Sequence, residues 1–89
     1  MMVRVLVRLK PGIMDVQGTA VRRALAGLGF TDLMGLRIGK VIEMDLEAPS
    51  IARARGRAED MCRTLLANPI LEDYEIEVLG DVAGTRSGR

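Results

Sequence analysis

The segment LMGLRIGKVIEMDLE, residues Leu33 to Glu47, decides the fold because one alternation of side chains runs through its length. A period of two is typical of a β-strand with one buried face. The even positions are mostly apolar and the odd positions mostly polar: Met34, Leu36, Ile38, Ile42, Met44 and Leu46 against Arg37, Glu43, Asp45 and Glu47. The segment therefore predicts extended structure that keeps the same two faces on both sides of Gly39.

The topology at Gly39 has two solutions. A hairpin with a two-residue turn at Gly39 and Lys40 would set Leu36 opposite Glu43 and mix the faces. A three-residue loop centred on Gly39 keeps the faces apart, and so does one long strand bent at this glycine. We favour the bent strand, because the loop would expose Ile38.

Two further segments alternate like strands. Val3 to Leu9 is apolar at odd positions, with Arg4 and Arg8 between them. The last segment, Leu71 to Leu79, points apolar residues one way and acids the other: Tyr74, Ile76 and Val78 against Glu75 and Glu77. Opposite charges across strands favour pairing by roughly 0.2–1 kcal/mol, so the basic strand is expected between the two acidic ones. The charged outer face is either solvated or buried against another chain.

Two segments predict amphipathic helices. Asp15 is placed to cap the first, which should end near Gly29, and Ser50 to cap the second, which should end near Asn68-Pro69. At helical spacing the first carries Val16, Ala20, Val21, Ala24, Leu25 and Leu28, and the second Ile51, Ala54, Ala58, Met61, Cys62, Leu65 and Leu66. The order β-α-β-α-β, with a long or split middle strand, predicts an α+β two-layer sandwich of ferredoxin-like character with an antiparallel sheet.

Length and composition set the domain organisation and the compartment. A chain of 89 residues has room for one core. We expect one domain over residues 1–79 and a flexible C-terminal tail over residues 80–89, because GDVAGTRSGR has little apolar surface to offset the entropy of ordering it. A net charge of +1 and the lack of a long apolar stretch favour neither nucleic acid nor a membrane as partner. A single cysteine fits a reducing compartment, so we expect a cytoplasmic protein.

The residue types that catalyse most reactions are scarce. The chain has no histidine, which excludes Ser-His-Asp and Cys-His mechanisms, and Cys62 lies on an apolar helix face, where a core role is expected. The strand acids Glu43, Asp45 and Glu47 could hold a hard cation, but alternating acids are more often solvated or paired. No segment matches a phosphate-binding glycine loop, and Arg53, Arg55 and Arg57 fit a solvated helix face. We therefore expect no catalytic, cofactor-binding or metal-binding residue, and binding rather than catalysis.

Three runs resemble a known family. They are LKPGIMDVQGTAVRRAL (Leu9 to Leu25), RIGKVIEMDLE (Arg37 to Glu47) and LLANPILEDYEIEV (Leu65 to Val78). In this order and spacing they resemble the PurS family, and the resemblance covers nearly all of residues 2–79. Pro11 stands where the family commonly has an acid and Val16 where it commonly has a proline, which affects partner contacts more than the fold.

The resemblance implies a function in purine biosynthesis. Members of the family are non-catalytic small subunits of phosphoribosylformylglycinamidine synthase, a glutamine- and ATP-dependent ligase. They assemble the PurL synthetase with the PurQ glutaminase and support ammonia transfer. The resemblance further implies a homodimer or dimer of dimers, no cofactor in this chain, and ATP and Mg used by the complex.

Two exposed turns recur in the resemblance and are predicted as partner contacts. They comprise Gln17 and Gly18 at the first helix start, and Arg37, Gly39 and Lys40 at the bend. Core packing is not expected to require these residue types at exposed turns. The alternative function is a free-standing regulatory domain, like ACT domains, that binds a small metabolite at a dimer interface.

Overall fold

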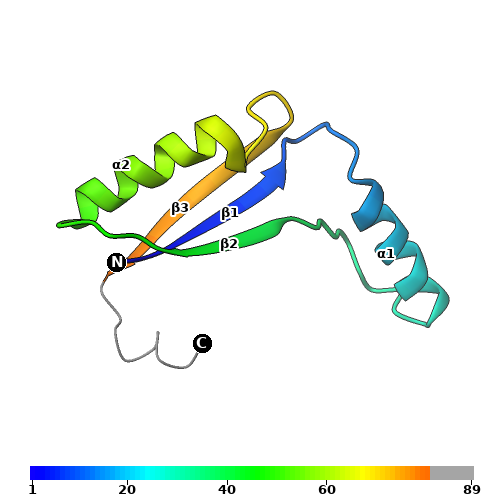
Figure 1. Cartoon of the computed structure of the whole chain (residues 1–89). Helices are drawn as coiled ribbons and strands as arrows, with labels where there is room; N and C mark the ends of the chain where they lie inside the picture. Colours follow the sequence, from blue (N-terminus) through cyan, green and yellow to red (C-terminus); the bar gives the residue numbers. More distant parts are fainter. Residues whose placement is uncertain (81–89) are drawn as a thin grey trace.

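The structure is a computed structural model that describes residues 1–80, so the predicted tail lies outside the described residues except for Gly80. The elements follow in the order β1 (Met2–Leu9), α1 (Val16–Gly27), β2 (Lys40–Asp45), α2 (Ile51–Met61), a single π-helical turn η1 (Cys62–Leu66) and β3 (Glu72–Gly80) (Figure 1). The predicted α+β class and element order are confirmed.

Strand β1 lies at the centre of an antiparallel sheet with the order β2-β1-β3. Val5 pairs with Ile42 on one side and Ile76 on the other, and Arg4 pairs with Glu43 and Glu77. The expected place of the basic strand between two acidic strands is confirmed.

Ion pairs cross the outer face of the sheet. The Arg4 guanidinium lies 3.3 Å from the Glu43 carboxylate and 3.4 Å from that of Glu77, and Arg8 lies 2.7 Å from Glu75. These side chains are substantially exposed, and such pairs contribute about 0–1 kcal/mol each. Their main effect is on strand order and register, because a different neighbour would place like charges together.

The core lies between β1 and α2. Val3, Val5 and Val7 are at most 1% exposed, and they face a helix stripe that is fully buried: Ala54, Ala58 and Cys62. The small side chains at a spacing of four let α2 lie close to the strands.

Two residues of the predicted helix face lie outside this stripe. Ile51, the first residue of α2, is 56% exposed, and Leu65 is 82% exposed. The Ala67 amide donates to the Cys62 carbonyl (3.2 Å), the spacing of a π-helix, and this wider turn rotates Leu65 away from the core.

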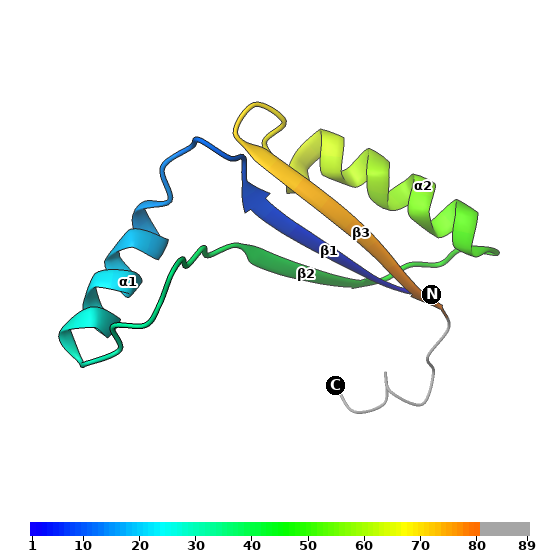
Figure 2. The same ribbon diagram turned by 180° about the vertical axis from the view of Figure 1, so that it is seen from behind.

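Helix α1 lies beyond the end of the sheet, whereas α2 covers one of its faces (Figures 1 and 2). The second layer of the sandwich therefore consists of α2 alone within the described chain. We call residues 11–39, which include α1 and the extended chain after it, the arm. The radius of gyration is 16.5 Å, against about 12 Å for a compact domain of this length, because the arm projects from the sheet.

The chain does not turn back on itself at Gly39. Strand β2 begins at Lys40 and pairs with β1, while residues 30–39 continue beyond the sheet without a strand partner. No hairpin is formed within the described residues, and the favoured long strand is correct only in its second half. The parity of the arm segment matches that of β2, yet the segment has no partner in the sheet and is linked to α1 by the bond from Arg22 to the Leu33 carbonyl.

We expect Ala58→Leu to destabilise the fold by about 1–3 kcal/mol, because the larger side chain has no space between α2 and the buried valines. Urea denaturation followed by circular dichroism, at equal protein concentrations, measures the effect. Ala52→Leu on the exposed side of the same helix is the matched control and should change stability by less than about 0.5 kcal/mol. Equal stability of the two variants would show that α2 is not closely packed.

Candidate junction site

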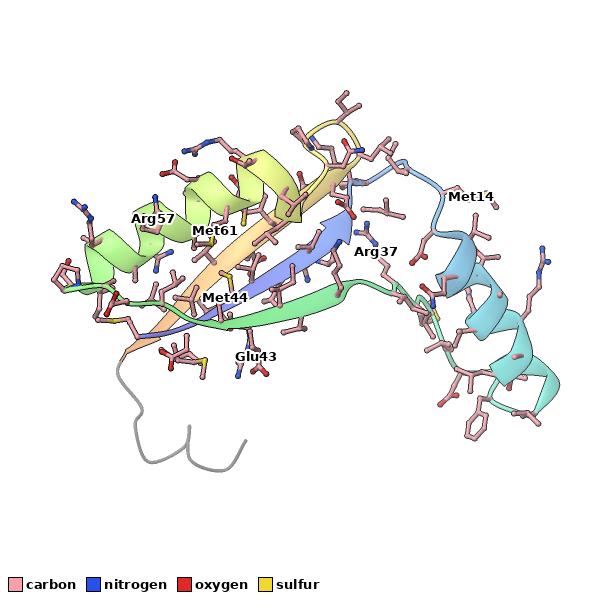
Figure 3. The ribbon with its side chains drawn as sticks, in the orientation of Figure 1. Met14, Arg37, Glu43, Met44, Arg57 and Met61 are labelled. Carbon is pink, nitrogen blue, oxygen red and sulfur yellow. The ribbon has the colours of Figure 1, made fainter. Side chains whose placement is uncertain are left out.

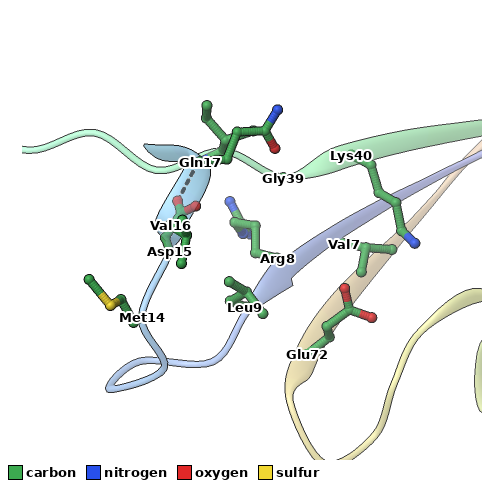
Figure 4. A pocket seen from close by; sticks show the side chains of 11 residues that line it. Val7, Arg8, Leu9, Met14, Asp15, Val16, Gln17, Gly39, Lys40 and Glu72 are labelled. Atoms are coloured by element: carbon green, nitrogen blue, oxygen red, sulfur yellow. Dashed lines mark hydrogen bonds between the residues drawn. The ribbon is translucent and has the colours of Figure 1, made fainter. Parts of the chain in front are cut away.

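The arm joins the sheet at a surface pocket of ≈ 390 Å³, which we call the junction pocket (Figure 4). Its walls come from the end of β1, the start of α1 and the start of β2. The residues that line it include Val7, Leu9, Asp15, Gln17, Gly39 and Lys40. It therefore brings the two predicted contact turns together from positions more than 20 residues apart in the sequence.

The Asp15 carboxylate holds this junction together. One oxygen accepts the Gly18 amide at 2.8 Å and so caps α1, as predicted. The other accepts the Ile38 amide at 2.8 Å, which ties the helix start to the chain just before β2. The hydrogen bond from Ile38, then that from Gly18 and the nearby Arg37 charge, hold the pKa of Asp15 below its ordinary value of 3.8.

Local packing explains both glycines of the predicted site. A Cβ atom on Gly18 would overlap the Asp15 carboxylate, and one on Gly39 would overlap the backbone carbonyl of Val7. The premise that packing does not demand these residue types is therefore wrong for the two glycines. Their direct contact with a partner stays a prediction.

The other three predicted residues differ in their surroundings. The Arg37 guanidinium donates to the Leu9 carbonyl, so it fastens the arm to the end of β1. Gln17 and Lys40 are exposed, and within the described part of the chain their side chains make no hydrogen bond or ion pair. These two side chains are the ones that stay available to another molecule.

The junction pocket holds few groups suited to chemistry. Arg8 is paired with Glu75, and the Glu72 carboxylate accepts the Asn68 amide at 2.7 Å. Asp15 accepts two amides, so among the described charged groups of the pocket the Lys40 ammonium is the one without a hydrogen bond or ion pair. Such a site can receive a polar or anionic group of a partner, but it offers no nucleophile with an adjacent base.

Groups elsewhere in residues 1–80 are equally unsuited to catalysis. Cys62 is fully buried, and burial, helped by the Glu59 charge, raises the pKa of its thiol, so it stays protonated at neutral pH. Burial and the hydrogen bond to Glu59 (3.2 Å) raise the pKa of Tyr74. In this range no three acids, cysteines or histidines converge in a way that could hold a metal ion, and no helix has the length and apolarity to cross a membrane.

Sequence reasoning missed two features. It assigned Asp15 only as a helix cap, because a local pattern carries no information about a bond to Ile38, 23 residues further on. It also predicted a two-layer sandwich, which implies that the apolar face of α1 covers the sheet, although Val16 is 70% and Leu28 74% exposed. The periodicity that predicts an amphipathic helix does not say which surface the helix covers.

Comparisons with known proteins match nearly the whole chain to one family. Residues 2–80 match the family described as PurS: Phosphoribosylformylglycinamidine (FGAM) synthase. The Synechocystis subunit PurS of phosphoribosylformylglycinamidine synthase is 44% identical over 84% of this chain and 75% of its own. The crystal structure of Methanocaldococcus jannaschii PurS is similar with a TM-score of 0.80 and 34% identity, over 85% of this chain and 92% of that one.

A further similar chain comes from the structure of PurLQS from Thermotoga maritima. The TM-score is 0.76 at 26% identity, over 86% of this chain and 96% of the other. The fold described above thus recurs in a chain solved within a larger assembly.

We expect Asp15→Asn to release the arm while keeping α1 capped, because the amide offers one oxygen where two are needed. The measurement is hydrogen exchange at the Ile38 amide, whose protection should fall. Asp32→Asn, an exposed acid of the same arm, is the matched control and should leave that protection unchanged.

The hydrogen bond from the Ile38 amide to Asp15 should make the hydrogen-exchange protection of this amide depend on pH. The pKa of Asp15 is lower in the folded chain than its ordinary value. The stabilisation of the arm by this carboxylate is therefore fully present above pH 3.8 and is lost as the pH falls through the pKa of the folded chain. The Ile38 protection factor should fall there in the wild type and stay constant in Asp15→Asn. Identical profiles would contradict the role given to this carboxylate.

Proposed function

Since the chain belongs to the PurS family of phosphoribosylformylglycinamidine synthase subunits, we propose that it acts in purine biosynthesis as the non-catalytic subunit that assembles PurL and PurQ. The observation that carries this is the match over residues 2–80, supported by the likeness to a chain of PurLQS. The comparisons do not favour the alternative of a metabolite-binding regulatory domain.

In the proposed mechanism, the chain acts by holding two other subunits close together. The glutaminase subunit releases ammonia, and the synthetase uses it with ATP to form the amidine. Holding the two subunits together raises the effective concentration of ammonia at the synthetase and limits its escape to solvent. In this proposal ATP and Mg bind to the partner subunits, this chain contributes no cofactor site, and the complex works in the cytoplasm.

The junction pocket is the proposed contact with the larger subunits. Lys40 supports this role, because its charge is exposed and unpaired within residues 1–80, and Gln17 lies on the same pocket. A homodimer or dimer of dimers would present this pocket more than once, which suits a subunit that joins others.

We expect the chain to restore glutamine-dependent synthesis by the PurL and PurQ subunits while barely changing ammonia-dependent synthesis. The measurement is formation of formylglycinamidine ribonucleotide with each nitrogen source, with and without the chain. An absent response with both nitrogen sources would overturn the proposed function.

Lys40→Glu should weaken assembly with the larger subunits about tenfold, or about 1.4 kcal/mol, since it reverses an exposed charge at the proposed contact. The test is the dissociation constant by calorimetry or interferometry. Arg53→Glu, an exposed charge on α2 away from the junction pocket, makes the same kind of change and should bind normally. Unchanged binding by Lys40→Glu would remove the junction pocket from the interface.

A further inference from the structure

Lysine side chains are scarce in this chain. Of its 13 basic residues, Lys10 and Lys40 are the lysines and the others are arginines. An arginine guanidinium stays protonated near neutral pH, whereas a lysine ammonium can lose a proton and then attack an activated acyl group. The two lysines are therefore the side chains that an acyl donor can convert to stable amides.

Lys10 and the amino group of Met1 are both held by carboxylates (Figure 3 draws the side chains of the described residues). The Lys10 ammonium lies 3.9 Å from the Asp73 carboxylate, and its side chain is 41% exposed. The Met1 amino group lies 3.1 Å from the Asp45 carboxylate and 2.9 Å from the Leu46 carbonyl oxygen. A carboxylate beside an amine repels an anionic reagent. Both amines are thus shielded from a negatively charged acyl donor.

Lys40 has different surroundings at the start of β2. Its side chain lines the junction pocket and is exposed, and within residues 1–80 its ammonium makes no hydrogen bond or ion pair. Figure 4 shows this side chain extending from β2 on the side of the pocket away from Asp15. The carboxylates of Asp15 and Glu72 are already occupied by backbone amides. The Lys40 ammonium is therefore accessible to a dissolved reagent.

The junction pocket also has room and an apolar wall for a short acyl group. Val7 lies opposite Lys40 in the sheet register. Val7, Leu9 and Val16 line the pocket, whose volume of ≈ 390 Å³ is many times that of an acetyl group. An ammonium keeps its charge in water, whereas a neutral amide with its acyl group can lie against apolar side chains. The pocket can thus accommodate the product of acylation.

We propose that Lys40 is an acylation site, at which a short-chain acyl phosphate converts the exposed ammonium to a neutral amide. The negative charges of such a donor favour approach to an unpaired cation. The ammonium first loses a proton to water, and the amine then bonds to the carbonyl carbon of the donor. The bond from this carbon to the phosphate oxygen breaks, the phosphate leaves with the electron pair, and a second proton passes to water.

The modification removes the free charge of the junction pocket. Acylation of Lys40 therefore weakens the contact between this chain and the larger subunits. This consequence rests on the proposed function, whereas the choice of Lys40 over Lys10 depends on the fold of the chain alone.

The site is tested with the full chain and acetyl phosphate, followed by peptide mass spectrometry. Lys40 should acquire the acetyl group about twofold to fivefold faster than Lys10, the range that an exposed ion pair contributes. In concentrated urea the two rates should approach each other, because the difference depends on the fold. Equal rates in the folded chain, or faster acetylation of Lys10, would overturn the proposed site.

The effect on assembly is tested by binding to the larger subunits before and after acetylation. Treated wild type should bind about threefold more weakly, a smaller loss than for Lys40→Glu, because one charge is removed and not reversed. Lys40→Arg keeps the charge but cannot be acylated in this way, so treatment should leave its binding unchanged. Lys10→Gln removes a charge outside the junction pocket and should bind as wild type. Unchanged binding of treated wild type, or an equal loss in treated Lys40→Arg, would overturn the effect.

The tests separate this inference from the proposed function. The rate comparison uses the chain alone, so it decides the acylation site whether or not the larger subunits bind. In the complex, acetylation of Lys40 should slow while that of Lys10 keeps its rate, and an unchanged Lys40 rate would overturn the link to assembly. Selective acetylation of a chain that fails to restore glutamine-dependent synthesis would overturn the proposed function and leave the acylation site standing.

Discussion

Strand β1 is bonded on both sides, and the position of every other described element follows from it. Its inward valines bring α2 to one face, because small side chains on the helix allow close approach, and its outward arginines select acidic neighbours. The end of β1 also anchors the arm, because the Leu9 carbonyl accepts a hydrogen bond from Arg37 and Gly39 lies close to the Val7 carbonyl. One strand therefore sets the strand order, the covered face and the direction of the arm.

Alternation and charge were sufficient to predict the sheet, because strand pairing depends on local periodicity and on side chains directly opposite one another. The placement of α1 was not predictable in this way. Its apolar stripe indicates that some surface covers it, yet a helix that packs in its own chain and one that packs elsewhere have the same pattern. Leu65 was misplaced for a related reason, since the π-helical turn that rotates it has no sequence signal that we recognised.

The sequence suggested two exposed turns as partner contacts, but it did not show how the chain joins these turns. Gln17, Gly39 and Lys40 line one pocket, and the bond from Asp15 to Ile38 holds the two turns together. Gly18 lets the Asp15 carboxylate come close, and Gly39 does the same for the Val7 carbonyl. Arg37 fastens the arm to β1, whereas Gln17 and Lys40 remain exposed. Residues that build the junction and residues that stay exposed on it thus lie next to each other in the same two turns. This arrangement suits a subunit whose role is to hold others in place.

The pairing of β1 with β3 also bears on how the chain is made. Met2 lies opposite Gly80 in the register, so of the described elements the central strand is synthesised before the others and its second neighbour after them. Until then β1 can pair only with β2 and keeps one edge open, and such edges attract other strands. Because β1 pairs with a strand from the other end of the described chain, the sheet also predicts slow folding for so small a domain. Completion of the sheet is therefore a late event, because it waits until the other described elements have been made.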